Sequence, residues 1–314
     1  DGYPYGIEFK AGATQTGGIT NSGQISGGLV GIYMPYAKLT GGIQNSGSIT
    51  GTQGVILENS SITGIITNTA LISGANAGIN TSQSYIEGIN NSGTIVGANA
   101  FFIVNGSTIN GQVINSGSIQ GAANGYGGGH GFRLQNSALT GSFINTGTIN
   151  GATGLVVSSS VLLDGINSSG KVVGVYSGIL VTDSHIANGI RNSGTVSGDY
   201  YALNIGYSTI SGGISNSGMI SGGSGLTLSN AQLSGNLSNS NTVSVSGNGI
   251  YVSGSTITGN ISNSGLIFGS DGILLLSSTL SGGFINSGSI TASDSAVFID
   301  GSAIGGGFAN SGLI

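Results

Sequence analysis

One seven-residue phrase recurs along the whole chain at nearly constant intervals. It reads IQNSGSI at 43–49, INNSGTI at 89–95, IRNSGTV at 190–196 and FINSGSI at 284–290. Its third position, which we call the marker, is an asparagine in every copy except the one that carries Ser168. Successive markers are 23 or 24 residues apart, apart from one interval of 30 residues. A fixed period of this length is the signature of a repeat architecture.

The composition excludes collagen and disorder, although the chain contains 63 glycines. Collagen is excluded because there are only 2 prolines and no G-X-Y period. Disorder requires low hydrophobicity and high charge, whereas this chain is 38% hydrophobic and 5% charged. The net charge of −5, without a basic run, argues against nucleic acid as a partner. No apolar run is long enough to predict membrane insertion, and the absence of cysteine excludes disulfides and thiolate metal sites.

The spacing of apolar residues within each repeat predicts β-strands. An aliphatic residue or phenylalanine stands two places before each marker, and an aliphatic residue stands four places after it. A second phrase, such as GVILENSSI at 54–62 or GIYVSGSTI at 249–257, fills the other half of each repeat. Its apolar residues alternate with the period of a half-buried strand. Each repeat therefore predicts three short strands, written G-I-x-L, S-T-I-x-G-x-I and N-S-G-x-I-x-G, with Gly, Ser and Asn at the corners.

One such repeat cannot bury its apolar side alone, but stacked repeats bury a continuous core. We therefore predict an all-β fold, a parallel β-helix (β-solenoid) of about 13 coils of 23–24 residues with three short strands per coil. Residues 1–314 are expected to form a single domain, with a Gly-rich loop insertion at about 121–131. Parallel stacking would place identical side chains above one another, so the aliphatic positions become core columns.

The marker asparagines are predicted to form a structural amide ladder. Each amide can donate to one neighbouring copy and accept from the other at a tight turn. An inward-facing structural column is expected in place of a row of identical ligand sites. The predicted Asn ladder comprises Asn21, Asn45, Asn68, Asn91, Asn115, Asn145, Asn192, Asn216, Asn239, Asn263, Asn286 and Asn310.

The repeats resemble the Gly/Ser/Asn-rich β-strand repeats of bacterial surface proteins, of the INNSGTI and ISNSGSI type. Autotransporter passenger domains and filamentous adhesins carry such repeats, and the resemblance covers all 314 residues. It implies a right-handed parallel β-helix that is exported and displayed outside the cell.

The long interval between markers contains GAANGYGGGHGF at 121–132. It lacks the G-x-x-x-x-G-K-[ST] pattern of a phosphate-binding loop. Insertions in solenoids form loops on one face, so Tyr126 and His130 are candidate recognition residues. The alternative is a corner loop without a binding role.

Two aspartates form a weak candidate catalytic pair. Asp271 and Asp294 both follow their markers by eight residues, so parallel stacking would place them in adjacent coils, and Asp300 is near them in sequence. Glycosidases use two carboxyl groups on either side of one sugar bond. Aspartates on a solvated corner are the simpler interpretation, and His130 and His185 are isolated in sequence. No enzyme activity, cofactor or metal is therefore expected.

The sequence predicts a non-enzymatic extracellular structural protein, the shaft or subunit of a cell-surface filament or adhesin. The alternatives are a carbohydrate-active β-helix enzyme, either a lyase or a glycosidase, and a glycan-binding shaft. Surface glycans and host or neighbouring cell surfaces are candidate partners in addition to further copies of the chain. The tyrosines expected to be exposed, and so able to stack on sugars, are Tyr33, Tyr36, Tyr200, Tyr201 and Tyr207. The alternative is that they are scattered surface residues without a binding role.

The two ends of the sequence predict self-association. The chain closes on NSGLI and opens on DGYPYGIEF, which contains the G-I-x-L phrase expected next. Written end before beginning, NSGLI-DGYPYGIEF resembles the internal NSGLI-FGSDGILL, in which the spacing from marker to glycine is nine residues. The spacing from marker to glycine is ten residues across this join, as it is from Asn21 to Gly31. We therefore expect a head-to-tail homopolymer formed by coil-on-coil stacking, an open assembly because the contact does not close on itself. The alternative is that residues 1–314 are a segment of a longer array of the same repeats.

Overall fold

The computed structural model describes residues 3–123 and 128–314, and every regular element among them is a β-strand. Two compact units are present, Asp1–Leu162 and Leu163–Ile314, and each is described by itself. Both are parallel β-solenoids, and the two together contain about 13 turns. The predicted all-β parallel solenoid is confirmed. The handedness and the single domain stay predictions.

Each turn of the first unit contributes strands to two parallel sheets. Its first sheet contains β1 (Tyr5–Glu8), β4 (Gln24–Ser26), β5 (Val30–Pro35), β8 (Ser48–Glu58), β10 (Leu71–Ser82), β12 (Thr94–Gly97), β13 (Asn99–Val104), β16 (Ser118–Gly121), β17 (His130–Gln135) and β20 (Thr148–Ser158). Its second sheet contains β2 (Thr14–Thr16), β3 (Ile19–Asn21), β6 (Lys38–Thr40), β7 (Ile43–Asn45), β9 (Ser61–Asn68), β11 (Tyr85–Asn91), β14 (Thr108–Ile109), β15 (Val113–Asn115), β18 (Ala138–Leu139), β19 (Phe143–Asn145) and β21 (Val161–Leu162).

The second unit follows the same plan. Its first sheet contains β23 (Lys171–Thr182), β26 (Thr195–Gly206), β29 (Met219–Ser229), β32 (Thr242–Val245), β33 (Ile250–Ser253), β36 (Leu266–Gly269), β37 (Ile273–Leu276), β40 (Ser289–Ala292) and β41 (Val297–Asp300). Its second sheet contains β22 (Ile166–Ser168), β24 (His185–Ile186), β25 (Ile190–Asn192), β27 (Thr209–Ser211), β28 (Ile214–Asn216), β30 (Gln232–Ser234), β31 (Leu237–Asn239), β34 (Thr256–Ile257), β35 (Ile261–Asn263), β38 (Thr279–Leu280), β39 (Phe284–Asn286), β42 (Ala303–Ile304) and β43 (Phe308–Asn310).

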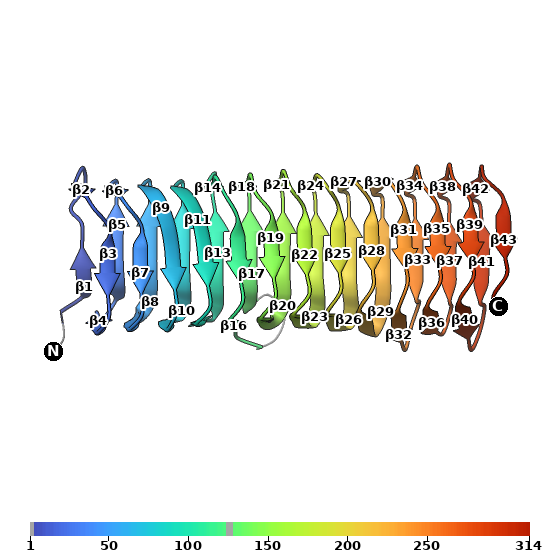
Figure 1. Ribbon diagram of the computed structural model, residues 1–314, viewed down its shortest axis with the longest axis horizontal. Coiled ribbons are helices and arrows are strands. Elements are labelled where there is room, and N and C mark those ends of the chain that lie inside the picture. The colour runs from blue at the N-terminus through green and yellow to red at the C-terminus, as the bar shows by residue number, and fades with distance from the viewer. Residues whose placement is uncertain (1–2, 124–127) are drawn as a thin grey trace. The chain divides into compact units, whose positions relative to one another are not determined.

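Within each unit, strands pair in parallel with their copies in the next turn, so equivalent residues stack (Figure 1). Ile72, for example, pairs with Ile49 on one side and Ile95 on the other. The columns of Ile and Val that this register produces are almost completely buried in the interior turns, and these three isoleucines are each 0% exposed. Burial of each such side chain stabilises the fold by roughly 1.5–3 kcal/mol.

The glycine that opens the G-I-x-L phrase is required by close packing. At Gly78, an added Cβ would lie 2.6 Å from Cγ2 of Ile95 and 2.7 Å from the carbonyl oxygen of Ala100. A larger residue would therefore push the core column away from the strand.

The strand boundaries differ in detail from the three predicted phrases. The marker asparagine is the last residue of its strand, as in β7, and the residues that follow it form the corner. In several turns, such as β8 and β23, the third phrase of one repeat continues into the first phrase of the next as one strand of 11 or 12 residues. The alternating pattern identifies the inward residues, but it does not show where the chain bends.

A second corner is held by serine. The residue before it has a positive φ, for example 49° at Asn59 and 50° at Gln83. This conformation favours glycine and asparagine. The serine hydroxyl then accepts a hydrogen bond from a backbone N–H one turn earlier. Ser84 Oγ accepts from the Ser60 N–H at 3.1 Å and donates to the Ser82 carbonyl at 2.8 Å. The serine column is therefore a second polar ladder.

The expected insertion lies between β16 and β17. The N–H of Ala152, in the following turn, lies within hydrogen-bonding distance of the carbonyl oxygens of both Ala122 and Gly129. Ala122 and Gly129, on either side of the insertion, therefore both lie against the same peptide group of the following turn.

One buried polar residue interrupts a core column of the first unit. Thr81 pairs with Leu57 and Ile103, is fully buried, and its hydroxyl has no hydrogen-bond partner. Because valine has nearly the same shape without the unpaired hydroxyl, Thr81→Val should raise the free energy of unfolding by about 1 kcal/mol. Thermal unfolding against the exposed control Thr63→Val checks this. A melting temperature lowered by Thr81→Val alone would contradict the inward placement of Thr81.

Candidate functional site

The marker asparagines form hydrogen-bonded rows inside each unit. In the first unit, Nδ2 of each asparagine donates to Oδ1 of the next at 2.8 Å, from Asn21 to Asn145. In the second unit, the same bond of 2.8–2.9 Å runs from Asn192 to Asn310. The second amide hydrogen reaches backbone oxygens, those of Gly93 and Ser118 in the case of Asn91.

Most of these amides are almost completely withdrawn from solvent, whereas Asn310, the last of the second row, is exposed. The five asparagines from Asn45 to Asn145 are each 2% exposed or less. A ligand approaching from outside cannot reach them. The geometry therefore assigns the asparagine rows to the interior of the solenoid.

One of the two predicted recognition residues has a defined environment, because Tyr126 lies outside the described residues. His130 is the first residue of β17, and its Nδ1 is buried without a hydrogen-bond partner. Burial, with a smaller contribution from the guanidinium of Arg133, lowers the pKa of His130 to about 4, so the imidazole is neutral at pH 7. The side chain of Arg133 stacks on Phe102, with 5.1 Å between the guanidinium carbon and the ring centroid.

The predicted acidic pair lies on one corner of successive turns. Asp271 precedes β37 and Asp294 follows β40. The backbone N–H of Asp294 donates to the carbonyl of Ser270 at 2.9 Å, which brings the backbones of the two aspartates close together. Asp294 is exposed and Asp271 is partly exposed. Among the described residues, no group of three or more His, Cys, Asp or Glu side chains could hold a metal ion.

The five tyrosines singled out from the sequence have different surroundings. Tyr33 stacks on Tyr5 and donates a hydrogen bond from its hydroxyl to Glu58 Oε2 at 2.9 Å. This hydrogen bond, together with partial burial, raises the pKa of Tyr33 to about 12. Tyr200 stacks on Tyr176 with ring centroids 5.6 Å apart. Both rings are therefore engaged with neighbouring side chains of the protein.

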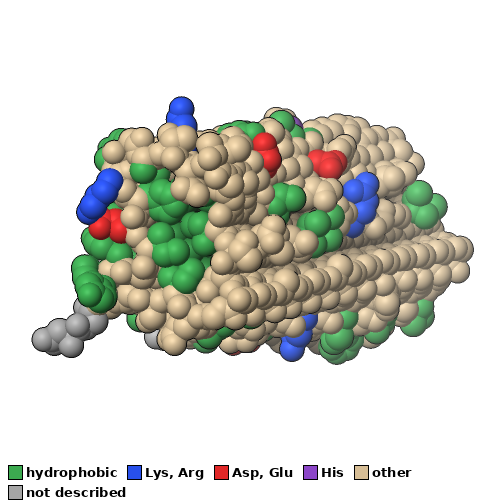
Figure 2. All heavy atoms as spheres, turned by 60° about the vertical axis from the view of Figure 1, so that its left-hand side comes forward, with side chains coloured by type: hydrophobic (Ala, Val, Ile, Leu, Met, Phe, Trp, Pro, Cys, Tyr) green, Lys and Arg blue, Asp and Glu red, His purple; other side chains and the backbone are tan. Residues whose placement is uncertain are grey.

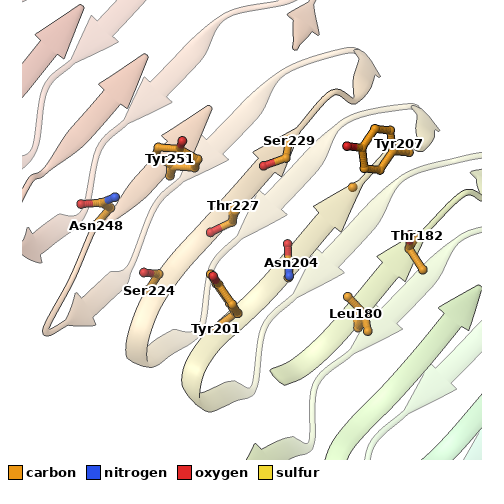
Figure 3. A pocket seen from close by; sticks show the side chains of 11 residues that line it. Leu180, Thr182, Tyr201, Asn204, Tyr207, Ser224, Thr227, Ser229, Asn248 and Tyr251 are labelled. Atoms are coloured by element: carbon orange, nitrogen blue, oxygen red, sulfur yellow. The ribbon is translucent and has the colours of Figure 1, made fainter. Parts of the chain in front are cut away.

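Tyr201 and Tyr207 instead line a groove of about 640 Å³ in the second unit. We call it the tyrosine groove, and its principal lining residues are Tyr201, Asn204, Tyr207, Thr227, Asn248 and Tyr251. Figure 3 shows the side chains of Asn204 and Thr227 between the three tyrosine rings. Its volume is in the range of small-ligand sites.

Strand register explains how these residues meet. Asn204 pairs with Leu180 on one side and Thr227 on the other, and Thr227 pairs with Tyr251. These four residues form one outward row across β23, β26, β29 and β33. With strands about 4.8 Å apart, three intervals span roughly 14 Å. The surface is hollowed in the middle of this row because the side chains of Asn204 and Thr227 are smaller than those of Leu180 and Tyr251 at its two ends.

The sides of the groove are aromatic. Tyr201 lies three residues before Asn204 on β26 and pairs with Ser224 of β29. Its side chain is 39% exposed. Tyr207 stands at the corner after β26 and is 66% exposed. Gly206, which carries no side chain, leaves space beside Tyr207.

Thr227 is the most buried of these polar residues. Its side chain is 5% exposed, and its Oγ1 is buried without a hydrogen-bond partner in the protein. The side-chain amides of Asn204 and Asn248 are also not hydrogen-bonded to other described residues. The groove therefore combines aromatic faces with uncommitted amide and hydroxyl groups.

Charged groups near the groove are acidic. Asp183, which is exposed, follows the lining residue Thr182, and the exposed Asp199 lies two residues before Tyr201. The cations of the second unit, Lys171 and Arg191, do not line the groove. On the face drawn in Figure 2, charged side chains are few and scattered.

Sequence reasoning identified Tyr201 and Tyr207 but missed Asn204, Thr227 and Tyr251. A usable signal exists, because Asn204 and Tyr251 stand twelve places after their markers and Thr227 stands eleven places after its marker. An alignment of the outward positions of successive repeats, like that of the inward positions, brings these residues together.

Comparison with protein-family models, with curated proteins and with solved structures finds no significant match to this chain. No helix among the described residues is long and apolar enough to cross a membrane. The repeat geometry and the groove are therefore the basis for assigning a function.

The amide ladder leads to a prediction at Asn216, whose Nδ2 donates to Asn239 and to the carbonyls of Gly218 and Thr242. Asn216→Asp replaces this donor by a buried carboxylate facing oxygen atoms. The free energy of unfolding should fall by about 3 kcal/mol or more at pH 7, measured by urea denaturation.

The pH dependence of this fall in the free energy of unfolding provides a control for the Asn216→Asp experiment. Burial beside oxygens raises the pKa of the introduced carboxyl above its unfolded value, and the neutral acid can donate a hydrogen bond. The loss should therefore shrink as pH falls through that raised pKa. Ser215→Asp, exposed on the same strand, should show neither effect. An Asn216→Asp variant as stable as the Ser215→Asp variant would rule out a structural role for the amide.

Proposed function

We propose that this chain is a structural protein, a solenoid shaft displayed outside the cell as part of a filament or adhesin. The observation that carries the proposal is the repetition of the same ladders in turn after turn. Within each unit, asparagine amides, serine hydroxyls and aliphatic columns recur at equivalent positions. A sequence organised in this way fixes the number of turns in each unit and gives those turns the same cross-section.

Two further features support an extracellular setting. The repeats resemble those of bacterial surface proteins in their Asn-Ser-Gly phrases. The chain also has only 5 Lys and Arg residues in 314, and many of its peptide groups are paired in sheets. Few trypsin sites and a continuously hydrogen-bonded backbone would suit a protein exposed to proteases.

Assembly from further copies of the chain is part of this proposal. Each turn hydrogen-bonds the next through both sheets, and a turn without a neighbour has unpaired backbone groups along its edge. A second solenoid with the same cross-section can continue the ladders. Phe308 illustrates the packing, because its ring stacks on that of Phe284 at 4.5 Å while the side chain stays 50% exposed.

Electron microscopy of the purified chain tests the assembly. Filaments should form at high protein concentration, and immunogold labelling of intact source cells should decorate the surface. Phe308→Asp should suppress filaments, because it places a charge on a face that the next copy would desolvate. Ser281→Asp, exposed on the preceding turn and outside the serine ladder, should form filaments less affected than those of Phe308→Asp. Separate particles at every concentration would contradict the assembly.

The proposal also assigns no catalytic role to Asp271 and Asp294. Glycosidases place one carboxyl group of raised pKa beside a sugar bond and a second within reach of the same sugar. The carboxylate of Asp294 is exposed on a corner, so it lacks the enclosed position beside a bound sugar that this chemistry needs. The chain should release neither reducing ends nor unsaturated products from polysaccharides, as measured by colorimetric and ultraviolet assays. Turnover that disappears in an Asp271→Asn, Asp294→Asn double variant would refute the structural proposal.

A further inference from the structure

We propose that the tyrosine groove of the second unit binds a segment of a neutral carbohydrate chain. This binding role goes beyond the shaft function and does not depend on it, because it rests on the groove alone. Aromatic faces, amides and hydroxyls are the groups that recognise the apolar faces and hydroxyl groups of sugars.

The conformation of Tyr207 is the first feature that points to a ligand. Its φ is 50°, a left-handed value that is uncommon for a bulky residue. Equivalent corners of the same unit carry Asp183, Asn230 and Gly254, which tolerate this conformation better. The fold therefore does not need a tyrosine at this corner. Tyr207 places a 66%-exposed ring beside the groove, which is where a stacked sugar would lie.

The unpaired hydroxyl of Thr227 is the second such feature. A buried polar atom without a partner destabilises the fold, so its presence in a groove points to a partner from outside the protein. Thr227 lines the groove between Asn204 and Tyr251 in the outward row, and its Oγ1 is buried there. A ligand hydroxyl could satisfy it together with the amide of Asn204. An aromatic ring at Tyr251 closes one end of the same row (Figure 3).

The surroundings select the class of ligand. Exposed acids near the groove, Asp183 and Asp199, disfavour anionic sugars, and no lysine or arginine lines the groove to bind them. An extended peptide would require a free strand edge. The groove offers none, because β26 and β29 pair on both sides with neighbouring strands. A groove of about 640 Å³ across four strands fits a short stretch of a longer chain.

Isothermal titration of the full chain tests the proposal. The probes are cellohexaose, maltohexaose, mannohexaose and chitohexaose, with hexagalacturonate as the anionic comparison. At least one neutral hexasaccharide should bind with a dissociation constant of about 1 mM or lower. Hexagalacturonate should bind at least about tenfold more weakly, because of the acids at the groove. Absence of binding by all four neutral probes, or tighter binding of hexagalacturonate, would overturn the proposal.

Matched variants locate the site. Tyr207→Asn keeps a residue suited to positive φ and should weaken binding by about tenfold or more. Tyr251→Thr, which copies the row neighbour Thr227, should weaken binding similarly. Tyr36→Asn is the control, since Tyr36 has the same φ of 50°, is 62% exposed in the first unit and is not a lining residue of the groove. Binding that is equally affected by Tyr207→Asn and Tyr36→Asn, or by neither, would overturn the location.

Thr227→Val separates binding from folding. Because Oγ1 of Thr227 has no partner in the protein, its removal should leave the melting temperature unchanged or raise it. Binding of the hexasaccharide should nevertheless weaken several-fold. An unchanged affinity in a normally folded Thr227→Val variant would show that the hydroxyl does not contact the sugar, which would contradict the proposed placement of the sugar over the groove floor.

Discussion

The asparagine amide is the group on which the repeat depends, because it can donate and accept along one axis. In a parallel stack, the side chain of each marker asparagine must hydrogen-bond to the marker of the turn before it and to the marker of the turn after it. Asn216 does this by accepting from Asn192 and donating to Asn239, both at 2.8 Å. An aspartate lacks the donor, so it could not take this position without losing hydrogen bonds. The amide thereby supports the register between adjacent turns, which the turn carrying Ser168 keeps through its paired strands.

Once the register is fixed, the remaining features of each turn follow from it. Aliphatic residues that share a phase become core columns, and glycine is required where a strand approaches such a column, as at Gly78. Serine completes the other corner by capping backbone groups of the neighbouring turn. Outward positions carry no such constraint. Variation is therefore concentrated on the outer rows, and the tyrosine groove arises where one row passes from Leu180 to Tyr251 through two smaller residues.

Much of the fold was predictable because inward positions repeat. The period, the parallel pairing and the Ile columns can all be read from residues such as Ile49, Ile72 and Ile95, whose spacing is nearly constant. Strand ends were less predictable, because the bend after each asparagine depends on backbone angles that the alternation does not encode. The groove was only half predictable. Tyr207 is conspicuous in sequence, whereas Thr227 matters through its burial and its unpaired hydroxyl, which are properties of the packed structure.

The exchange of asparagine side-chain amide protons tests the central claim most directly. Nuclear magnetic resonance spectra of the chain labelled with ¹⁵N at asparagine would be followed after transfer into D₂O. The ladder amides, such as that of Asn115, which is fully buried, should keep their signals long after that of the exposed Asn110 has gone. Loss of all asparagine amide signals at the rate of Asn110 would contradict a buried, hydrogen-bonded ladder.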